Sequence, residues 1–133
     1  MPLYCHPRLR VKACKLLKGI YGLKQAGRVW NETFTEVLLE LGYLQSQADP
    51  CVFVKSDMTK VNIVFFWVDD IILACENAKT EKWFEVCIRD KFGVKDLGEV
   101  SWFLGIRVSR NTSDGTIQLD QQQYLERVLV KLG

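Results

Sequence analysis

The chain has 133 residues, of which 48% are hydrophobic and 26% are charged, and its formal net charge at pH 7 is +2. This length suits one domain with its own hydrophobic core, and the ordinary globular composition excludes a disordered segment. The longest apolar run, Ile63 to Val68, is too short to cross a bilayer and no signal-peptide pattern opens the sequence, so we expect an intracellular protein, neither secreted nor associated with a membrane.

The basic residues are concentrated in the first part of the chain. Residues 1–31 contain seven Lys or Arg residues and no Asp or Glu, whereas the other residues include 11 basic and 16 acidic ones. A basic segment that precedes a mildly acidic remainder of the chain is suited to bind a polyanion close to a metal-binding site. A solvated terminus explains this pattern equally well. The seven residues are Arg8, Arg10, Lys12, Lys15, Lys18, Lys24 and Arg28.

Helical and strand patterns alternate in the first half of the chain. Apolar residues at positions i, i+3, i+4 and i+7 predict an amphipathic helix from Asn31 to Leu41, ended by Gly42. Two β-rich runs, Cys51–Lys55 and Val61–Val68, flank the polar segment SDMTK, which is typical of a hairpin connection. A further strand is expected over residues 71–75.

The second half continues in the same way. A second helix is predicted over residues 78–92, with Gly93 at its end. The segment VSWFLGIRVSR alternates and predicts one half-buried strand, and Thr116–Leu119 predicts a return strand. Asp120 is placed to cap a last helix. This order predicts an α+β fold with a largely antiparallel sheet covered by helices on one face.

Two adjacent carboxylates, Asp69 and Asp70, interrupt the most apolar segment, FFWVDDIILA. The apolar runs on either side each match one buried strand, so we expect a tight hairpin with Val68, Asp69 and Asp70 at its bend. At a bend, neighbouring side chains can lie near one rim. Mg²⁺ is usually held by one or two carboxylates with water and phosphates, and two-metal phosphoryl transfer uses shared carboxylates. An exposed turn without a ligand explains the pair equally well.

Three segments, Ile20–Trp30, Trp67–Asp70 and Asp96–Gly105, follow one another in a characteristic order. They resemble L-Y-G-L-K-Q-A-P-R-x-W, Y-V-D-D and D-L-G-x-x-x-x-F-L-G of the reverse transcriptase of copia-type long-terminal-repeat retrotransposons. The resemblance implies one partial reverse transcriptase domain: an unmatched basic segment over residues 1–10, a polymerase-palm-like sheet over residues 11–119, and the start of the thumb helix over residues 120–133.

The same resemblance implies template-directed nucleotidyl transfer in the parent protein. Its partners would be an RNA template, a DNA primer, dNTP and the remainder of the polyprotein with fingers, thumb and RNase H, and its cofactor Mg²⁺ or Mn²⁺. Asp69 is implied as the catalytic metal ligand and Asp70 as its less direct partner. The implied nucleotide and template contacts are Tyr21, Gly22, Lys24, Gln25 and Arg28, and the implied primer-holding residues are Trp67, Phe103, Leu104 and Gly105.

Each implied role has a structural alternative. Lys24 and Arg28, four residues apart, could be one solvated helix face, and Phe103 with Leu104 could be plain core. An apolar stripe on the last helix is expected to be exposed. The stripe consists of Tyr124, Leu125, Val128, Leu129 and Leu132.

Three departures from the family pattern bear on activity. Trp67 stands in place of Tyr, Gly27 in place of Pro, and the first acidic residue of the chain is Glu32, so no aspartate precedes the first motif as the family requires. We therefore expect weak metal binding and an inactive fragment, and leave open whether the chain alone is an enzyme. The alternative is a non-catalytic nucleic-acid-binding or assembly module derived from a retroelement. A stand-alone phosphoesterase using Asp69 and Asp70 is disfavoured because no His or third carboxylate clusters with them.

Overall fold

The computed structural model describes residue 17 and residues 19–57 and 60–133. The chain forms two units, one ending at Ala74 and one beginning at Cys75. In the described residues, helices alternate with antiparallel strands, which confirms the predicted α+β fold. None of the helices among these residues is long and apolar enough to span a membrane. Five basic residues of the N-terminal segment lie outside the described residues: Arg8, Arg10, Lys12, Lys15 and Lys18.

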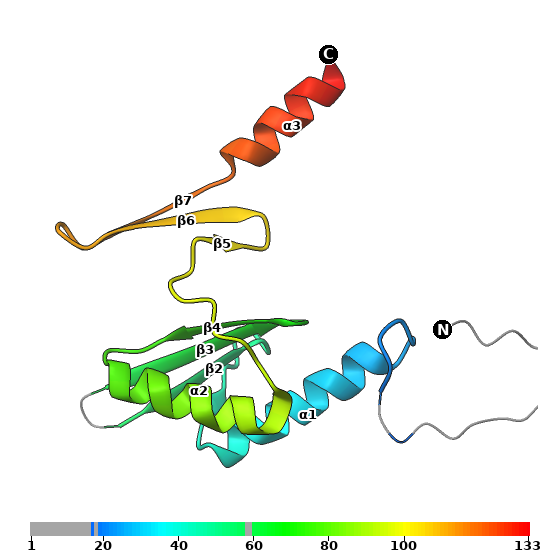
Figure 1. The fold of residues 1–133 in the computed structure, drawn as a ribbon, viewed down its shortest axis with the longest axis vertical. Coiled ribbons are helices and arrows are strands. Elements are labelled where there is room, and N and C mark those ends of the chain that lie inside the picture. The colour runs from blue at the N-terminus through cyan, green and yellow to red at the C-terminus, as the bar shows by residue number, and fades with distance from the viewer. Residues whose placement is uncertain (1–16, 18, 58–59) are drawn as a thin grey trace, which may run out of the picture. The chain divides into compact units, whose positions relative to one another are not determined.

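The first unit is built on a four-stranded antiparallel sheet in the order β1-β2-β3-β4. Figure 1 labels β2, β3 and β4 of this sheet. Every strand pairs with the next one along the chain, which is the arrangement that short hairpin connections favour. Strand β1 was not predicted, because two residues are too few to show an alternating pattern. The strands are β1 (Leu44–Gln45), β2 (Val52–Ser56), β3 (Val61–Trp67) and β4 (Asp70–Ala74).

Helix α1, Ala26–Glu40, completes the core of the first unit and begins five residues before the predicted start at Asn31. The ring of Phe34 on α1 meets Phe66 of β3 edge-on, with 4.7 Å between the centroids. Phe53 of β2 contacts the ring of Phe66, with 5.8 Å between the centroids. Aromatic pairs in these arrangements add stability beyond the area they bury. The buried side chains of this unit are Phe34, Val37, Leu38, Tyr43, Phe53, Val64 and Phe66.

Gly42 ends α1 as predicted, and the backbone shows why. Its φ of 84° lies in the left-handed region that glycine adopts without steric cost. The N–H of Gly42 donates to the carbonyl of Leu39 at 2.9 Å, and the N–H of Tyr43 donates to that of Leu38 at 3.0 Å. This pair of bonds is the Schellman arrangement, which satisfies carbonyl groups left over at a helix end.

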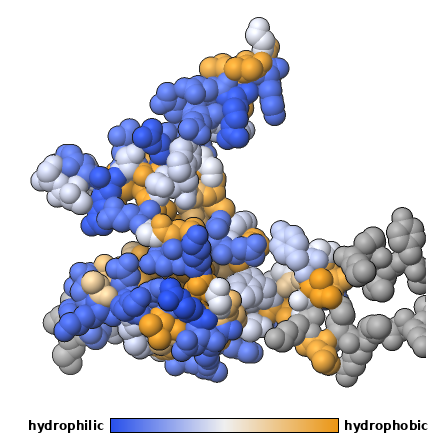
Figure 2. Space-filling view, in the orientation of Figure 1, coloured by the Kyte–Doolittle hydropathy of each residue, from blue (hydrophilic) through white to orange (hydrophobic). Residues whose placement is uncertain are grey.

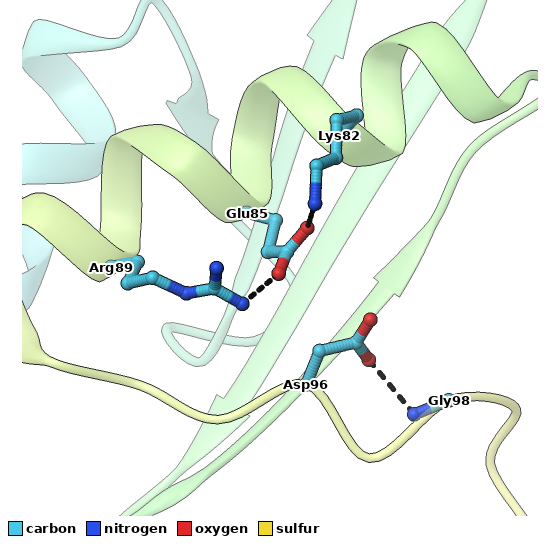
Figure 3. Close-up of polar contacts among 5 residues, drawn as sticks. All are labelled: Lys82, Glu85, Arg89, Asp96 and Gly98. Carbon is cyan, nitrogen blue, oxygen red and sulfur yellow. Dashed lines mark hydrogen bonds and ion pairs between the residues drawn. The ribbon is translucent and has the colours of Figure 1, made fainter.

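The second unit begins with helix α2, Ala78–Phe92, whose bounds match the prediction. The side chain of Asn77 caps it by accepting a hydrogen bond from the N–H of Thr80 at 2.9 Å. On the helix surface Glu85 lies between two cations and is bonded to both Lys82 and Arg89 (Figure 3). Such pairs at i+3 and i+4 spacing stabilise an exposed helix by a few tenths of a kcal/mol each.

A separate three-stranded antiparallel sheet follows, in the order β5-β6-β7. The prediction of one continuous strand over VSWFLGIRVSR is wrong: the segment is divided into β5 and β6 by a turn at Leu104 and Gly105. The prediction of a single sheet is also corrected, because the described strands form two. The strands are β5 (Trp102–Phe103), β6 (Ile106–Asn111) and β7 (Thr116–Asp120).

Helix α3, Gln122–Leu132, follows β7 directly (Figure 1). Asp120 is the last residue of β7 and accepts a hydrogen bond from the N–H of Gln122 at 3.2 Å, but the cap position belongs to Gln121, which corrects the predicted cap. No residue of α3 is buried, which confirms the exposed stripe, and apolar atoms are visible on this helix in Figure 2. Tyr124, Leu125, Leu129 and Leu132 are exposed and Val128 is half-buried.

Candidate metal site at the Asp69-Asp70 hairpin

The turn between β3 and β4 consists of Val68 and Asp69. Trp67 pairs with Asp70 across the strands, so the connection is two residues long and the tight hairpin is confirmed. Asp70 is already the first residue of β4 and does not belong to the bend. Val68 has a φ of 53°, which is a rare backbone conformation for a β-branched residue. Two-residue hairpins require positive φ because their twist must match that of the strands.

Both carboxylates of the hairpin are exposed to solvent. Val64 and Phe66, which lie earlier on β3, are buried. The apolar run before the aspartates therefore belongs to the core, and the end of the strand next to the turn is exposed to solvent. A hydrated carboxylate avoids the large cost of burying an unpaired charge. Two accessible carboxylates at a strand end fit a hard cation that keeps water and phosphate ligands. Within the described ranges no three His, Cys, Asp or Glu residues are grouped so as to hold a metal ion.

Trp30 of α1 contacts the hairpin turn, a role that the sequence analysis missed. Its indole Nε1–H donates a hydrogen bond to the carbonyl oxygen of Val68 at 2.5 Å. Its ring stacks on Phe34, with 5.5 Å between the centroids and 26° between the planes. One signal was available, because Trp30 precedes Phe34 by four residues and so continues the apolar face of the helix by one turn.

The segment before α1 contains most of the residues implied for nucleotide and template contact. Tyr21 is 87% exposed. Gly22 has a φ of 91°, and a Cβ added there would meet no atom within 4 Å, so the backbone is open to close approach. Lys24 lies in a turn and Gln25 is the N-cap of α1. The proposed single helix face for Lys24 and Arg28 is therefore wrong, because only Arg28 is helical.

Arg28 forms an ion pair with Glu32 one turn further along α1. The Arg28 Nε to Glu32 Oε1 distance is 2.6 Å, and the side chains are 82% and 54% exposed. The hydrogen bond and the charge of Glu32 raise the pKa of Arg28, which keeps the guanidinium protonated. Exposed ion pairs of this kind contribute little stabilising free energy, so a phosphate can compete with Glu32 for the guanidinium.

The third motif lies in the second unit. Leu104 and Gly105 form the β5–β6 turn with φ angles of 49° and 80°, a pattern typical of a type I′ turn. Leu104 is 49% exposed, so it is not a core residue, whereas Phe103 is half-buried. Earlier in the motif the Asp96 carboxylate accepts from the N–H of Gly98 at 2.8 Å (Figure 3). Of the implied site residues, the structure thus joins Trp67, Asp69 and Asp70 in one hairpin of the first unit.

Comparison with known proteins decides the family. A family model described as reverse transcriptase (RNA-dependent DNA polymerase) matches residues 8–133. The chain belongs to the reverse transcriptase family. The resemblance to the copia-type enzymes is thereby confirmed. The match begins at residue 8, three residues before the sheet segment over residues 11–119 that the resemblance implies.

Relatives of this reverse transcriptase chain come from plant and yeast transposons. It is 33% identical over 121 residues to the retrovirus-related Pol polyprotein from transposon TNT 1-94 of Nicotiana tabacum, covering 90% of the chain and 9% of that protein. For transposon RE1 of Arabidopsis thaliana the identity is 31% over 118 residues, covering 89% and 8%. For the putative transposon Ty5-1 protein of Saccharomyces cerevisiae it is 29% over 113 residues, covering 85% and 36%. No solved structure matches the chain.

Proposed function

We propose that this chain supplies the catalytic aspartate hairpin of a retrotransposon RNA-directed DNA polymerase. The observation that carries the proposal is an exposed Asp69-Asp70 pair at a two-residue hairpin in a chain of the reverse transcriptase family. In the parent protein the partners are an RNA template, a DNA primer, dNTP and the remainder of the polyprotein. We place this protein inside the cell, in a cytoplasmic particle or in the nucleus.

In this proposal Asp69 ligates Mg²⁺ or Mn²⁺ directly and Asp70 supports it from the start of β4. Divalent ions supply charge neutralisation at the attacking 3′-hydroxyl and the leaving pyrophosphate. The positions of the two side chains follow from the strand pairing, because the Trp67 to Asp70 pair closes the turn and leaves both carboxylates in solvent. The hairpin thus holds two negative charges at a rigid strand end before any cation arrives.

The other motif residues receive binding roles. Tyr21, Gly22 and Gln25 line the nucleotide and template side, where the open backbone at Gly22 permits close approach. Lys24 and Arg28 contact phosphates, since both are exposed cations. We assign contacts with the primer to Trp67 of the first unit and, separately, to Phe103, Leu104 and Gly105 of the second unit.

We further propose that the 133-residue chain does not extend a primer by itself. The family uses another metal-binding aspartate on a strand before the first motif, and the first acidic residue of this chain is Glu32. With ligands from one hairpin only, two metal ions would repel each other with little compensation. We expect no primer extension with Mg²⁺ or Mn²⁺. Nucleotide incorporation that disappears in Asp69→Ala would contradict this proposal of inactivity.

The metal-binding role is tested separately from activity. Titration with Mn²⁺, followed by paramagnetic broadening of backbone NMR signals, should broaden residues around the Asp69-Asp70 turn first. Asp69→Asn should abolish that selective broadening, because it removes a ligand charge. Asp90→Asn is the matched control, since Asp90 is also exposed but lies on α2. Equal broadening in the native chain and in Asp69→Asn would refute the metal site.

A second candidate function rests on the basic N-terminal segment. Residues 1–31 carry seven basic and no acidic residues, a charge pattern suited to a non-catalytic nucleic-acid-binding module. RNA affinity should then fall steeply with salt and decrease when Lys12, Lys15 and Lys18 are changed to Gln. Binding that is independent of salt would count against this module.

A further inference from the structure

We propose that Trp30 is a positioning residue for the Asp69-Asp70 hairpin. Its indole N–H holds the carbonyl oxygen of Val68 and thereby stabilises the left-handed turn from which the carboxylates project. The effect of Trp30 on metal binding rests on the proposed function. The effect of Trp30 on the turn itself does not.

The turn needs support because of the residue at its first position. Val68 is β-branched and has a φ of 53°. Left-handed backbone is disfavoured for an L-residue by roughly five- to thirtyfold, and glycine is the usual residue at such a position. Without a further interaction, the Val68 backbone would return to negative φ for part of the time.

The hydrogen bond from Trp30 ends on a backbone carbonyl next to Asp69, so it can orient the backbone of Asp69. The Val68 carbonyl belongs to the peptide unit that joins Val68 to Asp69, and a peptide unit is planar. An interaction that fixes this oxygen therefore also fixes the N–H of Asp69 and the start of its backbone. The direction of the Asp69 side chain follows from that backbone.

The donor is held firmly enough for this role. Trp30 is half-buried and its ring stacks on Phe34, which is fully buried. Phe34 contacts Phe66, which is two residues before Val68 on β3. Donor and acceptor therefore rest on the same aromatic cluster, so forming the bond orders few additional groups. Because α1 follows the Tyr21–Gln25 segment directly, one helix links that segment to the turn.

The test is Trp30→Phe in the full chain, which keeps an aromatic ring and removes the donor. Amide hydrogen exchange from Trp67 to Asp70, measured by NMR without metal, should become about tenfold faster, the loss expected for one hydrogen bond. Trp83→Phe is the matched control, because Trp83 is 40% exposed on α2. Unchanged exchange in the turn of Trp30→Phe would overturn the proposal.

Two further variants keep the test decisive. If Trp30→Phe does not fold, 3-benzothienylalanine introduced at position 30 retains the size and stacking of the indole and lacks only the N–H; turn exchange as slow as in the native chain would overturn the proposal. In a Val68→Gly background the turn no longer requires a disfavoured conformation. Trp30→Phe should then change the exchange by about threefold or less. An undiminished effect would show that the bond does not act on the left-handed conformation.

The metal readout separates this inference from the proposed function. Mn²⁺ should bind Trp30→Phe about three- to tenfold more weakly than the native chain, since one hydrogen bond is at stake, whereas Asp69→Asn should lose selective binding. Unchanged binding in Asp69→Asn would refute the proposed function. The exchange data would still decide whether the bond from Trp30 to Val68 stabilises the turn. Faster turn exchange in Trp30→Phe with unchanged Mn²⁺ affinity would overturn the positioning role.

Discussion

Two tight turns in the part of the chain that the structure describes, at β3–β4 and at β5–β6, meet the same backbone requirement in different ways. Each begins with an aliphatic residue at positive φ, Val68 at 53° and Leu104 at 49°. In the β5–β6 turn Gly105 follows with a φ of 80°, so one of the two positive-φ positions is taken by a glycine, which adopts this conformation without steric cost. In the β3–β4 turn Asp69 follows, and the support comes from Trp30, 38 residues earlier in the chain.

The difference shows how a fold accommodates chemistry at a strained position. A glycine at the start of the β3–β4 turn would relieve the backbone, but the motif places Val68 there, beside a carboxylate in the exposed second position. The strained backbone of Val68 is stabilised by the first unit, because Phe34 in its aromatic core contacts both Trp30 and Phe66 of β3. Strands β5 to β7 and helix α3, in contrast, contain no buried side chain.

The largest expected effect contrasts the two sheets. Phe66→Ala removes a side chain that is 2% exposed and should lower the free energy of unfolding of the first unit by about 3–5 kcal/mol, from lost burial and a cavity. Leu119→Ala in β7 removes one that is 64% exposed and should change stability by about 0.5 kcal/mol or less. Denaturant titration monitored by circular dichroism measures both. Equal losses would show that the contrast in burial has no energetic meaning.

The next effect concerns the glycine of the β5–β6 turn. Gly105→Ala should destabilise the hairpin by about 1–2 kcal/mol, because a Cβ at a φ of 80° is strained although no atom lies within 4 Å of it. Gly27→Ala is the control: its Cβ also meets nothing within 4 Å, but it lies in α1, where alanine should add about 0.5–1 kcal/mol. The same unfolding measurement applies, and opposite signs are expected for the two variants.

A smaller effect of opposite sign is expected at the β3–β4 turn. Val68→Gly relieves a left-handed conformation worth about 1–2 kcal/mol and introduces a more flexible unfolded chain worth about 0.5–1 kcal/mol. The net result should be a gain of up to about 1 kcal/mol in the free energy of unfolding. A loss of stability would mean that contacts of the valine side chain outweigh its backbone strain.

Local chemistry alone also predicts a pH effect in the second sheet. Hydrogen bonds from the side chain and backbone of Thr116 lower the pKa of Asp114 below its ordinary value of 3.8, with a contribution from Asn111. The resulting stabilisation is present above the unfolded pKa and is lost as pH falls through the folded one. NMR signals of the β6–β7 turn should therefore shift, in the native chain, as the pH falls below the ordinary carboxyl pKa of 3.8. In Asp114→Asn this titration should disappear, and its persistence would assign the effect to another group.

The sequence predicted elements well where one local pattern was enough. The bounds of α2 were found because an apolar stripe runs through it and Gly93 marks its end. The β3–β4 hairpin was found because two short apolar runs flank the aspartates. Strands β5 and β6 were merged because a two-residue turn inserts an even number of residues and leaves the alternation unbroken.

The candidate site was predictable only in its motif residues. Asp69 and Asp70 stand out as charges in an apolar run, which a reader of the sequence can see. The bond between Trp30 and Val68 joins residues 38 apart, and no period of a helix or strand encodes it. Likewise, the alternation of single strands does not say which strands share a sheet, so one sheet was predicted where the described strands form two.

Trp67 places one of the four tryptophans of the chain in the β3–β4 hairpin. The indole is 50% exposed, and its residue pairs directly with Asp70. A tryptophan in this position is sensitive to charge and solvent at the strand end, so arrival of a cation or a nucleotide beside the aspartates should change its emission. The chain thus carries a natural fluorophore next to Asp69 and Asp70, and binding there can be followed through its contribution to the emission without attaching a dye.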